Sequence, residues 1–206
     1  MNGVHLIVAT LLAGATMAGA PVAMAQSSDS VTRDELRMTA ECVVENDHRK
    51  AAELFSTLPG SPEEQRVERR LDAAFTACLG GDRRVAGDLA GVRAAIAVAL
   101  VAAAAPETPR AGEPWYRSAA AGKAAYSAYN PKRLGALEFG NCIMAAAPDA
   151  SVALVRAAPG SVAEHHAVDA LRPVVGPCMT RDVTVRLKAD DLRSLLAEPI
   201  YHATVR

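Results

Sequence analysis

The four cysteines are the residues whose type and spacing are best suited to chemistry. They are Cys42, Cys78, Cys142 and Cys178, so the second pair repeats the first at an offset of one hundred residues. Such thiols could form a redox-active pair or two structural disulfides. Redox-active pairs commonly have the spacing Cys-x-x-Cys, which is absent here. The cysteines are therefore predicted to be structural.

A turn midway between the cysteines of each pair predicts how they are connected. Four cysteines allow three connectivities. Cys42 lies seventeen residues before Pro59, and Cys78 lies seventeen residues after Ser61. Two antiparallel segments leaving the turn would place these cysteines side by side, and the same count holds one hundred residues later. We therefore predict the disulfides Cys42–Cys78 and Cys142–Cys178, each contributing roughly 3 to 4 kcal/mol by constraining the unfolded chain.

The histidines are the next candidates, as metal ligands or as acid–base groups. His165 and His166 are adjacent and follow Glu164. Adjacent helical residues point about 100° apart, whereas residues four apart share a face and can grip one ion. No metal site and no cofactor are predicted. His48 lies beside Asp47 and Glu45 and could form an acid–base pair, but the segment is interpreted as a helix break instead.

Nucleophilic catalysis has weaker support. The chain contains neither a Gly-x-Ser-x-Gly elbow nor a glycine-rich phosphate-binding loop with its lysine. Ser61 and Ser161 are expected to cap helices. A hydrolase site around His48, His202 or Tyr201, at the seam between the two halves of the chain, is kept as an alternative to a protein without catalytic activity.

The elements that must position these residues are themselves repeated. Chance matches would scatter over common residues, whereas these include both cysteines and a complete Pro-Gly-Ser turn. The matched positions are Arg33/Arg133, Cys42/Cys142, Leu54/Leu154, Pro59/Pro159, Gly60/Gly160, Ser61/Ser161, Glu64/Glu164, Leu71/Leu171, Cys78/Cys178, Asp82/Asp182, Val85/Val185, Arg93/Arg193, Ala97/Ala197 and Ala103/Ala203. Two internal repeats are predicted, over 33–104 and 133–204. Arg93/Arg193 and Asp82/Asp182 are interpreted as ion pairs or caps before the third helix rather than as ligand-binding groups.

Each repeat is expected to contain a helical hairpin, a short extended segment and a third helix. The first helix should break near Asp47 and, in the second repeat, at Pro148. The second helix should run from Pro62 to about residue 77, after a capping box, and should be shortened in the second repeat by Pro173 and Pro177. The extended segments, 82–88 and 182–188, could form a two-stranded β ladder between the repeats. The third helices, 89–104 and 190–203, should pack centrally.

The segment between the repeats, 105–132, has no counterpart upstream. It begins with a Pro- and Gly-rich linker and holds the only tryptophan and three of the four tyrosines. It is either a packed bridge over both halves or a binding surface. The candidate surface residues are Trp115, Tyr116, Tyr126 and Tyr129.

The ends and the charge balance suggest where the protein acts. Residues 1–25 have the apolar run and the small-residue cleavage site, after Ala25, of a secretory signal peptide. Residues 26–206 then form a single domain in the periplasm or outside the cell, where disulfides persist. The formal net charge of −1 gives no electrostatic footprint for nucleic acid. The apolar run Val92–Ala105 is too short to span a bilayer.

This arrangement resembles small secreted bacterial proteins that are uncharacterised. The resemblance rests on the export signal, the cysteine in each repeat, the Pro-Gly-Ser turn and a closing helix with the motif Leu-Arg-x-x-Leu-Ala-Glu. It covers most of the mature chain and implies the architecture alone, because it carries no activity and no binding residue.

A mainly α domain of two pseudo-symmetric halves is therefore the predicted fold. The first hypothesis for function is an exported, non-catalytic protein of the cell envelope that binds an unknown protein or small ligand at the seam or at the insert. A histidine hydrogen-bonded to a carboxylate in a buried cleft would favour the hydrolase instead.

Overall fold

The computed structural model is mainly helical. It describes residues 31–80, 89–104, 109, 112, 114–117, 131–179 and 186–204. The helices are α1 (Arg33–Glu53), the 3-10 helix η1 (Leu54–Ser56), α2 (Pro62–Leu79), α3 (Leu89–Ala104), α6 (Pro131–Ala146), α7 (Pro148–Arg156), α8 (Val162–Cys178) and α9 (Ala189–Thr204). The predicted signal peptide and most of the two segments predicted to be extended fall outside these ranges, as does the β ladder that these segments were expected to form.

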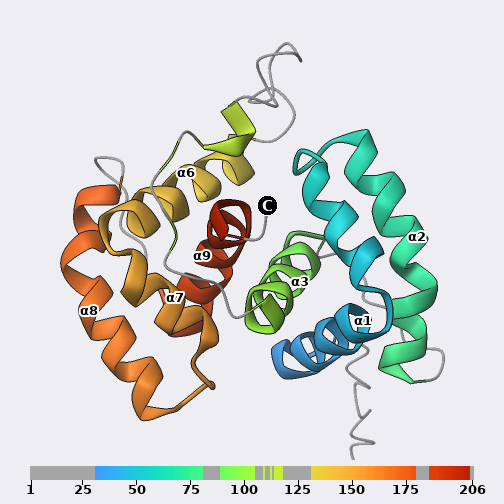
Figure 1. Cartoon of the computed structure of the whole chain (residues 1–206), viewed down its shortest axis with the longest axis horizontal. Coiled ribbons are helices and arrows are strands. Elements are labelled where there is room, and N and C mark those ends of the chain that lie inside the picture. Colours follow the sequence, from blue (N-terminus) through green and yellow to red (C-terminus); the bar gives the residue numbers. More distant parts are fainter. Residues whose placement is uncertain are drawn as a thin grey trace, which may run out of the picture.

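Helices α3 and α9 pack against each other at the centre of the molecule (Figure 1). Helices α1 and α2 lie on one side of this pair, and α6, α7 and α8 lie on the other. Ile96 and Leu100 of α3 and Leu196 and Ile200 of α9 are fully buried and belong to one continuous core. We call α1–α3 the N-terminal half, α6–α9 the C-terminal half, and the contact between them the seam.

The predicted break in the first helix of each half is confirmed. Asp47 interrupts α1 with φ −148° and ψ 62°. Ala147, one hundred residues later, separates α6 from α7 with φ −145° and ψ 69°. Pro148, at the start of α7, has no N–H to donate to the preceding turn. In the N-terminal half the Asp47 carboxylate instead accepts a hydrogen bond from the Lys50 N–H at 3.2 Å.

The turn after this helix also forms as expected. Gly60 and Gly160 have φ of 83° and 72°, a conformation that costs glycine little. Ser61 and Ser161 then cap α2 and α8 by accepting from the N–H of the glutamate three residues on. Glu64 and Glu164 do not complete a standard capping box, because each accepts from the glycine N–H rather than from the serine N–H.

The expectation that Pro173 and Pro177 shorten the second helix of the C-terminal half is wrong. Helix α8 continues through both prolines to Cys178. Both lie on its exposed face, where water can hydrate the carbonyl groups that lose a partner. Leu171 is buried, Val174 and Val175 pack against the core, and the disulfide fixes the end of the helix. These contacts offset a proline penalty of about 3 kcal/mol per residue.

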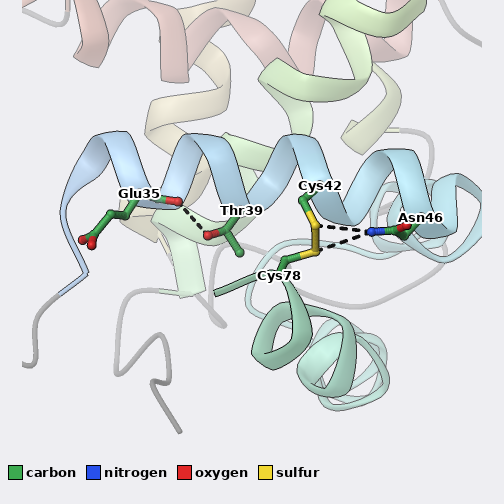
Figure 2. Close-up of a disulfide and its surroundings, with 5 residues drawn as sticks. All are labelled: Glu35, Thr39, Cys42, Asn46 and Cys78. Carbon is green, nitrogen blue, oxygen red and sulfur yellow. Dashed lines mark hydrogen bonds between the residues drawn. A yellow bond between two sulfur atoms is a disulfide. The ribbon is translucent and has the colours of Figure 1, made fainter. Parts of the chain in front are cut away.

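The predicted disulfide connectivity is confirmed in both halves. Cys42–Cys78 joins α1 to the end of α2 (Figure 2), and Cys142–Cys178 joins α6 to the end of α8. The Cα atoms of the two pairs are 5.9 and 5.7 Å apart, within the range that a disulfide spans without backbone movement.

Helix α3 is a core helix, as expected from its apolar sequence. Val92, Ile96, Leu100 and Val101 are buried. Among the described helices, none combines the length and the apolar character needed to cross a bilayer.

Candidate functional site

The most concentrated chemistry in the described structure surrounds the buried side chain of Arg93. Its guanidinium is 1% exposed and lies between carboxylates from both halves. The Nη2 atom donates to Glu198 Oε1 at 2.6 Å, Nε donates to Glu198 Oε2 at 2.9 Å, and Nη1 donates to Glu64 Oε1 at 3.1 Å. Burial alone would lower the pKa of Arg93, but the two carboxylates outweigh it and raise the pKa above its usual value.

Backbone groups of the turn before α2 occupy the other donors of Arg93. Nη1 donates to the carbonyl of Leu54 at 2.9 Å, and Nη2 donates to that of Thr57 at 3.1 Å. The guanidinium also lies 4.8 Å from the ring centroid of Phe55. Arg93 therefore holds η1, the turn after it and the start of α2 against α9, and a guanidinium so completely paired is suited to structure rather than to substrate binding.

Glu64 connects this cluster to the C-terminal half a second time. Arg133 of α6 donates to both carboxylate oxygens of Glu64, at 2.7 and 2.9 Å. Glu68, one turn further along α2, has one buried carboxylate oxygen without a hydrogen-bond partner among the described residues. Burial, followed by the nearby charge of Glu64, raises the pKa of Glu68 to about 7.

Glu198 is the acidic centre of the seam. Burial would raise its pKa, but the charge and hydrogen bonds of Arg93, together with the nearby ring of His202, lower it to about 2. His202 Nε2 lies 3.7 Å from Glu198 Oε1. Since Glu198 stays ionised at neutral pH and is held by Arg93, it is suited to orienting a neighbour rather than to exchanging protons.

Aromatic rings enclose His202. Its ring stacks on Trp115, with centroids 4.0 Å apart and planes 23° apart. The rings of Phe55 and Tyr201 meet it edge-on at 6.2 and 5.4 Å. The imidazole is therefore shielded from water by both halves and by the segment between them.

Arg193 has a similar but simpler environment. Its guanidinium donates to the carbonyls of Leu154 and Ala157, at 3.3 and 3.2 Å, and to the Glu164 carboxylate. These are the positions that lie one hundred residues after the N-terminal-half partners of Arg93. Burial would raise the pKa of Glu164, but the Gly160 N–H and Arg193 lower it.

A cavity of about 380 Å³ opens beside these arginines at the seam. Its volume falls at the lower end of the range for small-molecule sites. The wall combines apolar side chains with arginines and carboxylates, and many of its positions are paired at an offset of one hundred. The paired lining residues are Arg33/Arg133, Leu36/Ala136, Arg37/Leu137, Pro59/Pro159, Gly91/Asp191, Arg93/Arg193, Ala94/Ser194, Ala95/Leu195 and Val98/Glu198.

Two of the four proposed surface aromatics are inside the protein. Trp115 and Tyr116 are 8% and 3% exposed, and they cluster with Leu58 of the N-terminal half and Leu137 of the C-terminal half. Of the two alternatives for the insert, Trp115 and Tyr116 therefore follow the first: they form a packed bridge between the halves and not an exposed aromatic patch. Tyr126 and Tyr129 lie outside the described residues.

The remaining candidates are not brought together. His48 is exposed on α1, whereas His202 and Tyr201 are buried in the seam. His165 is exposed, and its Nδ1 lies 2.8 Å from the Ser161 carbonyl. Within the described ranges, no three His, Cys, Asp or Glu side chains are close enough to hold a metal ion. Asp82 and Asp182 lie outside these ranges.

Sequence reasoning missed the partners of the buried arginines. Arg93 and Arg193 stood out as matched positions, but Glu64 and Glu164 were assigned to capping alone, and Glu198 was not singled out. The available signal was an arginine inside the otherwise apolar α3 that recurs one hundred residues later in α9. Comparisons with models of protein families, with curated proteins and with solved structures found no match, so the site is interpreted from its geometry alone.

Proposed function

We propose that this chain is an exported, non-catalytic binding protein whose seam cavity takes a small ligand. The observation that carries the proposal is the cavity itself, which is lined by positions of both halves that are paired at an offset of one hundred residues. Ligand sites commonly form where two structural units meet. Two disulfides in the mature region support export, because such crosslinks persist in oxidising compartments.

The matched surroundings of Arg93 and Arg193 support the second part of the proposal, that the two halves are internal repeats. Each arginine binds the equivalent two carbonyls and the equivalent glutamate. Two internal repeats that pack face to face would leave a cavity where they meet, even if no residue had been selected to line it. Later substitutions on one side, such as Glu198 where the N-terminal half has Val98, would then give the cavity its asymmetry.

A screen of small metabolites against the oxidised protein tests ligand binding. Thermal shift identifies candidates, and isothermal titration calorimetry measures their dissociation constants. Ala94 lines the cavity on α3, so Ala94→Leu should weaken binding by filling space. Ala103→Leu, at the exposed end of the same helix, is the matched control. A ligand whose affinity is unchanged by Ala94→Leu does not bind in the seam, and the proposal would then be wrong.

The alternative is a hydrolase with its site at the same seam. One observation favours it: His202 lies beside Glu198, which also lines the cavity. The pairing of Glu198 with Arg93 and the aromatic enclosure of His202 favour a structural role.

A panel of ester and amide substrates separates the two functions. Turnover that is lost in His202→Gln, while the melting temperature and ligand binding are retained, would establish the enzyme. Absence of turnover in a protein that binds a ligand in the cavity would support the binding protein.

A further inference from the structure

The amide of Asn46 contacts one of the two disulfides. Its Nδ2 atom lies 3.3 Å from Cys42 Sγ and 3.8 Å from Cys78 Sγ, so that it faces both sulfur atoms (Figure 2). Asn46 sits one helical turn after Cys42 and directly before Asp47, where α1 is interrupted. The residue at the same position of the C-terminal half is Ala146, which has no hydrogen-bonding side chain. The two disulfides therefore differ in the group beside their sulfurs.

A donor at this place affects the chemistry of thiol–disulfide exchange. In the first step, an incoming thiolate attacks one sulfur, the S–S bond breaks, and the other sulfur leaves with the electron pair as a thiolate. A second thiol of the reductant then attacks the mixed disulfide and releases the remaining cysteine. Negative charge grows on the leaving sulfur during the first step, and an N–H group directed at that sulfur stabilises it.

We infer that Cys42–Cys78 is a site of thiol–disulfide exchange, with Asn46 as the group that assists bond cleavage by a dithiol reductant. Because Asn46 is nearer to Cys42, Cys42 is the leaving thiolate and Cys78 is the sulfur attacked. Both cysteines are partly exposed. Cys142–Cys178 is the matched disulfide without this assistance.

Opening this crosslink would leave the helices in place. Val67, Leu71 and Phe75 hold α2 in the core, and Val43 and Val44 do the same for α1. The reduced cysteines would therefore stay close together and re-form the bond when an oxidant returns. This property suits a reversible site better than a purely structural crosslink.

The test follows both disulfides in the same molecule. Oxidised protein is treated with dithiothreitol, quenched with an alkylating reagent at successive times and digested, and mass spectrometry measures each disulfide separately. Asn46→Ala should slow reduction of Cys42–Cys78 about threefold, the effect of one modest hydrogen bond. Asn46→Asp should slow it further, because a carboxylate cannot donate and repels the incoming thiolate. The rate at Cys142–Cys178 should not change.

The change in the ratio of the two rates is the decisive measurement. The wild-type ratio alone does not isolate the amide, since Cys142 is more exposed than Cys42. The reciprocal variant, Ala146→Asn, should accelerate reduction of Cys142–Cys178. Circular dichroism verifies that each variant keeps its helices, as expected for substitutions at exposed positions. If Asn46→Ala leaves the ratio unchanged, or slows both disulfides equally, the assigned role of Asn46 is overturned.

Discussion

Arg93 and Arg193 occupy equivalent places in the two halves but make different connections. Both bind the end of the first helical segment and the capping glutamate of the next helix, through contacts inside their own half. Arg93 adds Glu198, which belongs to the C-terminal half. Arg193 adds Asp190, one turn away on its own helix. The comparison indicates that the inner contacts build each half, whereas the seam depends on one arginine of the two.

The second arginine pair shows the same asymmetry. Arg133 binds Glu64 with both terminal nitrogens and is largely buried. Arg33 lies one hundred residues earlier, but it binds Asp191 at an exposed position. Exposed ion pairs contribute about 0 to 1 kcal/mol. Charge at the seam is thus concentrated around Glu64, Arg93 and Glu198.

Removing each arginine in turn should show the largest difference in stability between the two halves. Arg93→Met should lower the free energy of unfolding by about 3 to 5 kcal/mol, because it leaves Glu198 buried without its cation. Arg193→Met should cost less, since the second carboxylate that it abandons, Asp190, is half exposed and can be hydrated. Urea unfolding followed by circular dichroism measures both values. Equal losses would contradict the special role of Arg93.

Removing the acid at the seam should produce a loss that depends on pH. The pKa of Glu198 falls from 4.5 to about 2 on folding, so its contribution is complete above pH 4.5 and disappears as the pH falls toward 2. Glu198→Gln should cost roughly 3 kcal/mol at neutral pH, and its difference from wild type should narrow across that acid range. Asp190→Asn is the control, with a small effect expected. Urea unfolding at several pH values measures this difference. A difference between Glu198→Gln and wild type that is the same at every pH would refute this explanation.

The contact between α6 and α9 can be tested through Gly140. A Cβ atom at this position would collide with the Leu195 carbonyl oxygen and lie 3.3 Å from Pro199 Cγ. Position 40 of the N-terminal half holds alanine, so the approach is closer in the C-terminal half. Gly140→Ala should destabilise by about 1 to 3 kcal/mol. Gly135→Ala, on the same helix with no described atom within 4 Å of the new Cβ, should instead stabilise by about 0.5 to 1 kcal/mol. Thermal melts distinguish these opposite signs.

The smallest expected effect concerns Glu68, whose counterpart is Val168. Because its pKa rises from 4.5 to about 7 on folding, the folded state takes up a proton between these values, and wild-type stability should increase as the pH falls through that range. Glu68→Gln should raise the melting temperature at pH 8 and reduce this pH dependence. Glu63→Gln, at a half-exposed position of the same helix that pairs with Arg66, is the control. A lower melting temperature for Glu68→Gln at pH 8 would show that the carboxylate is stabilising.

Local signals predicted much of the fold. Pro59-Gly60-Ser61 and its repeat determine where one helix ends and the next begins, because glycine favours the left-handed conformation and serine caps. Their placement between the cysteines gave the disulfide pairing. Pro148 likewise indicated the break before α7. These are interactions among residues close in sequence, whose geometry is the same in most proteins.

The candidate site depended on contacts that no local rule contains. Glu198 lies 105 residues from Arg93, and nothing in its own helix distinguishes it from a solvated acid. The stacking of Trp115 on His202 joins the insert to the last helix, so the same ring could be predicted as an exposed surface. The prediction that Pro173 and Pro177 shorten α8 was wrong for a related reason. The packing that compensates for these prolines comes from residues elsewhere in the chain.

The distance along the chain between Arg93 and Glu198 has a consequence for biosynthesis. A ribosome completes α3 well before it reaches α9. The nascent chain therefore contains the Arg93 guanidinium before Glu198, its strongest acceptor, has been synthesised. Glu64 and two backbone carbonyls of the N-terminal half can pair with this guanidinium, but water must take the place of Glu198 until α9 arrives. The N-terminal part of the nascent polypeptide should therefore close tightly only after translation of the C-terminal part.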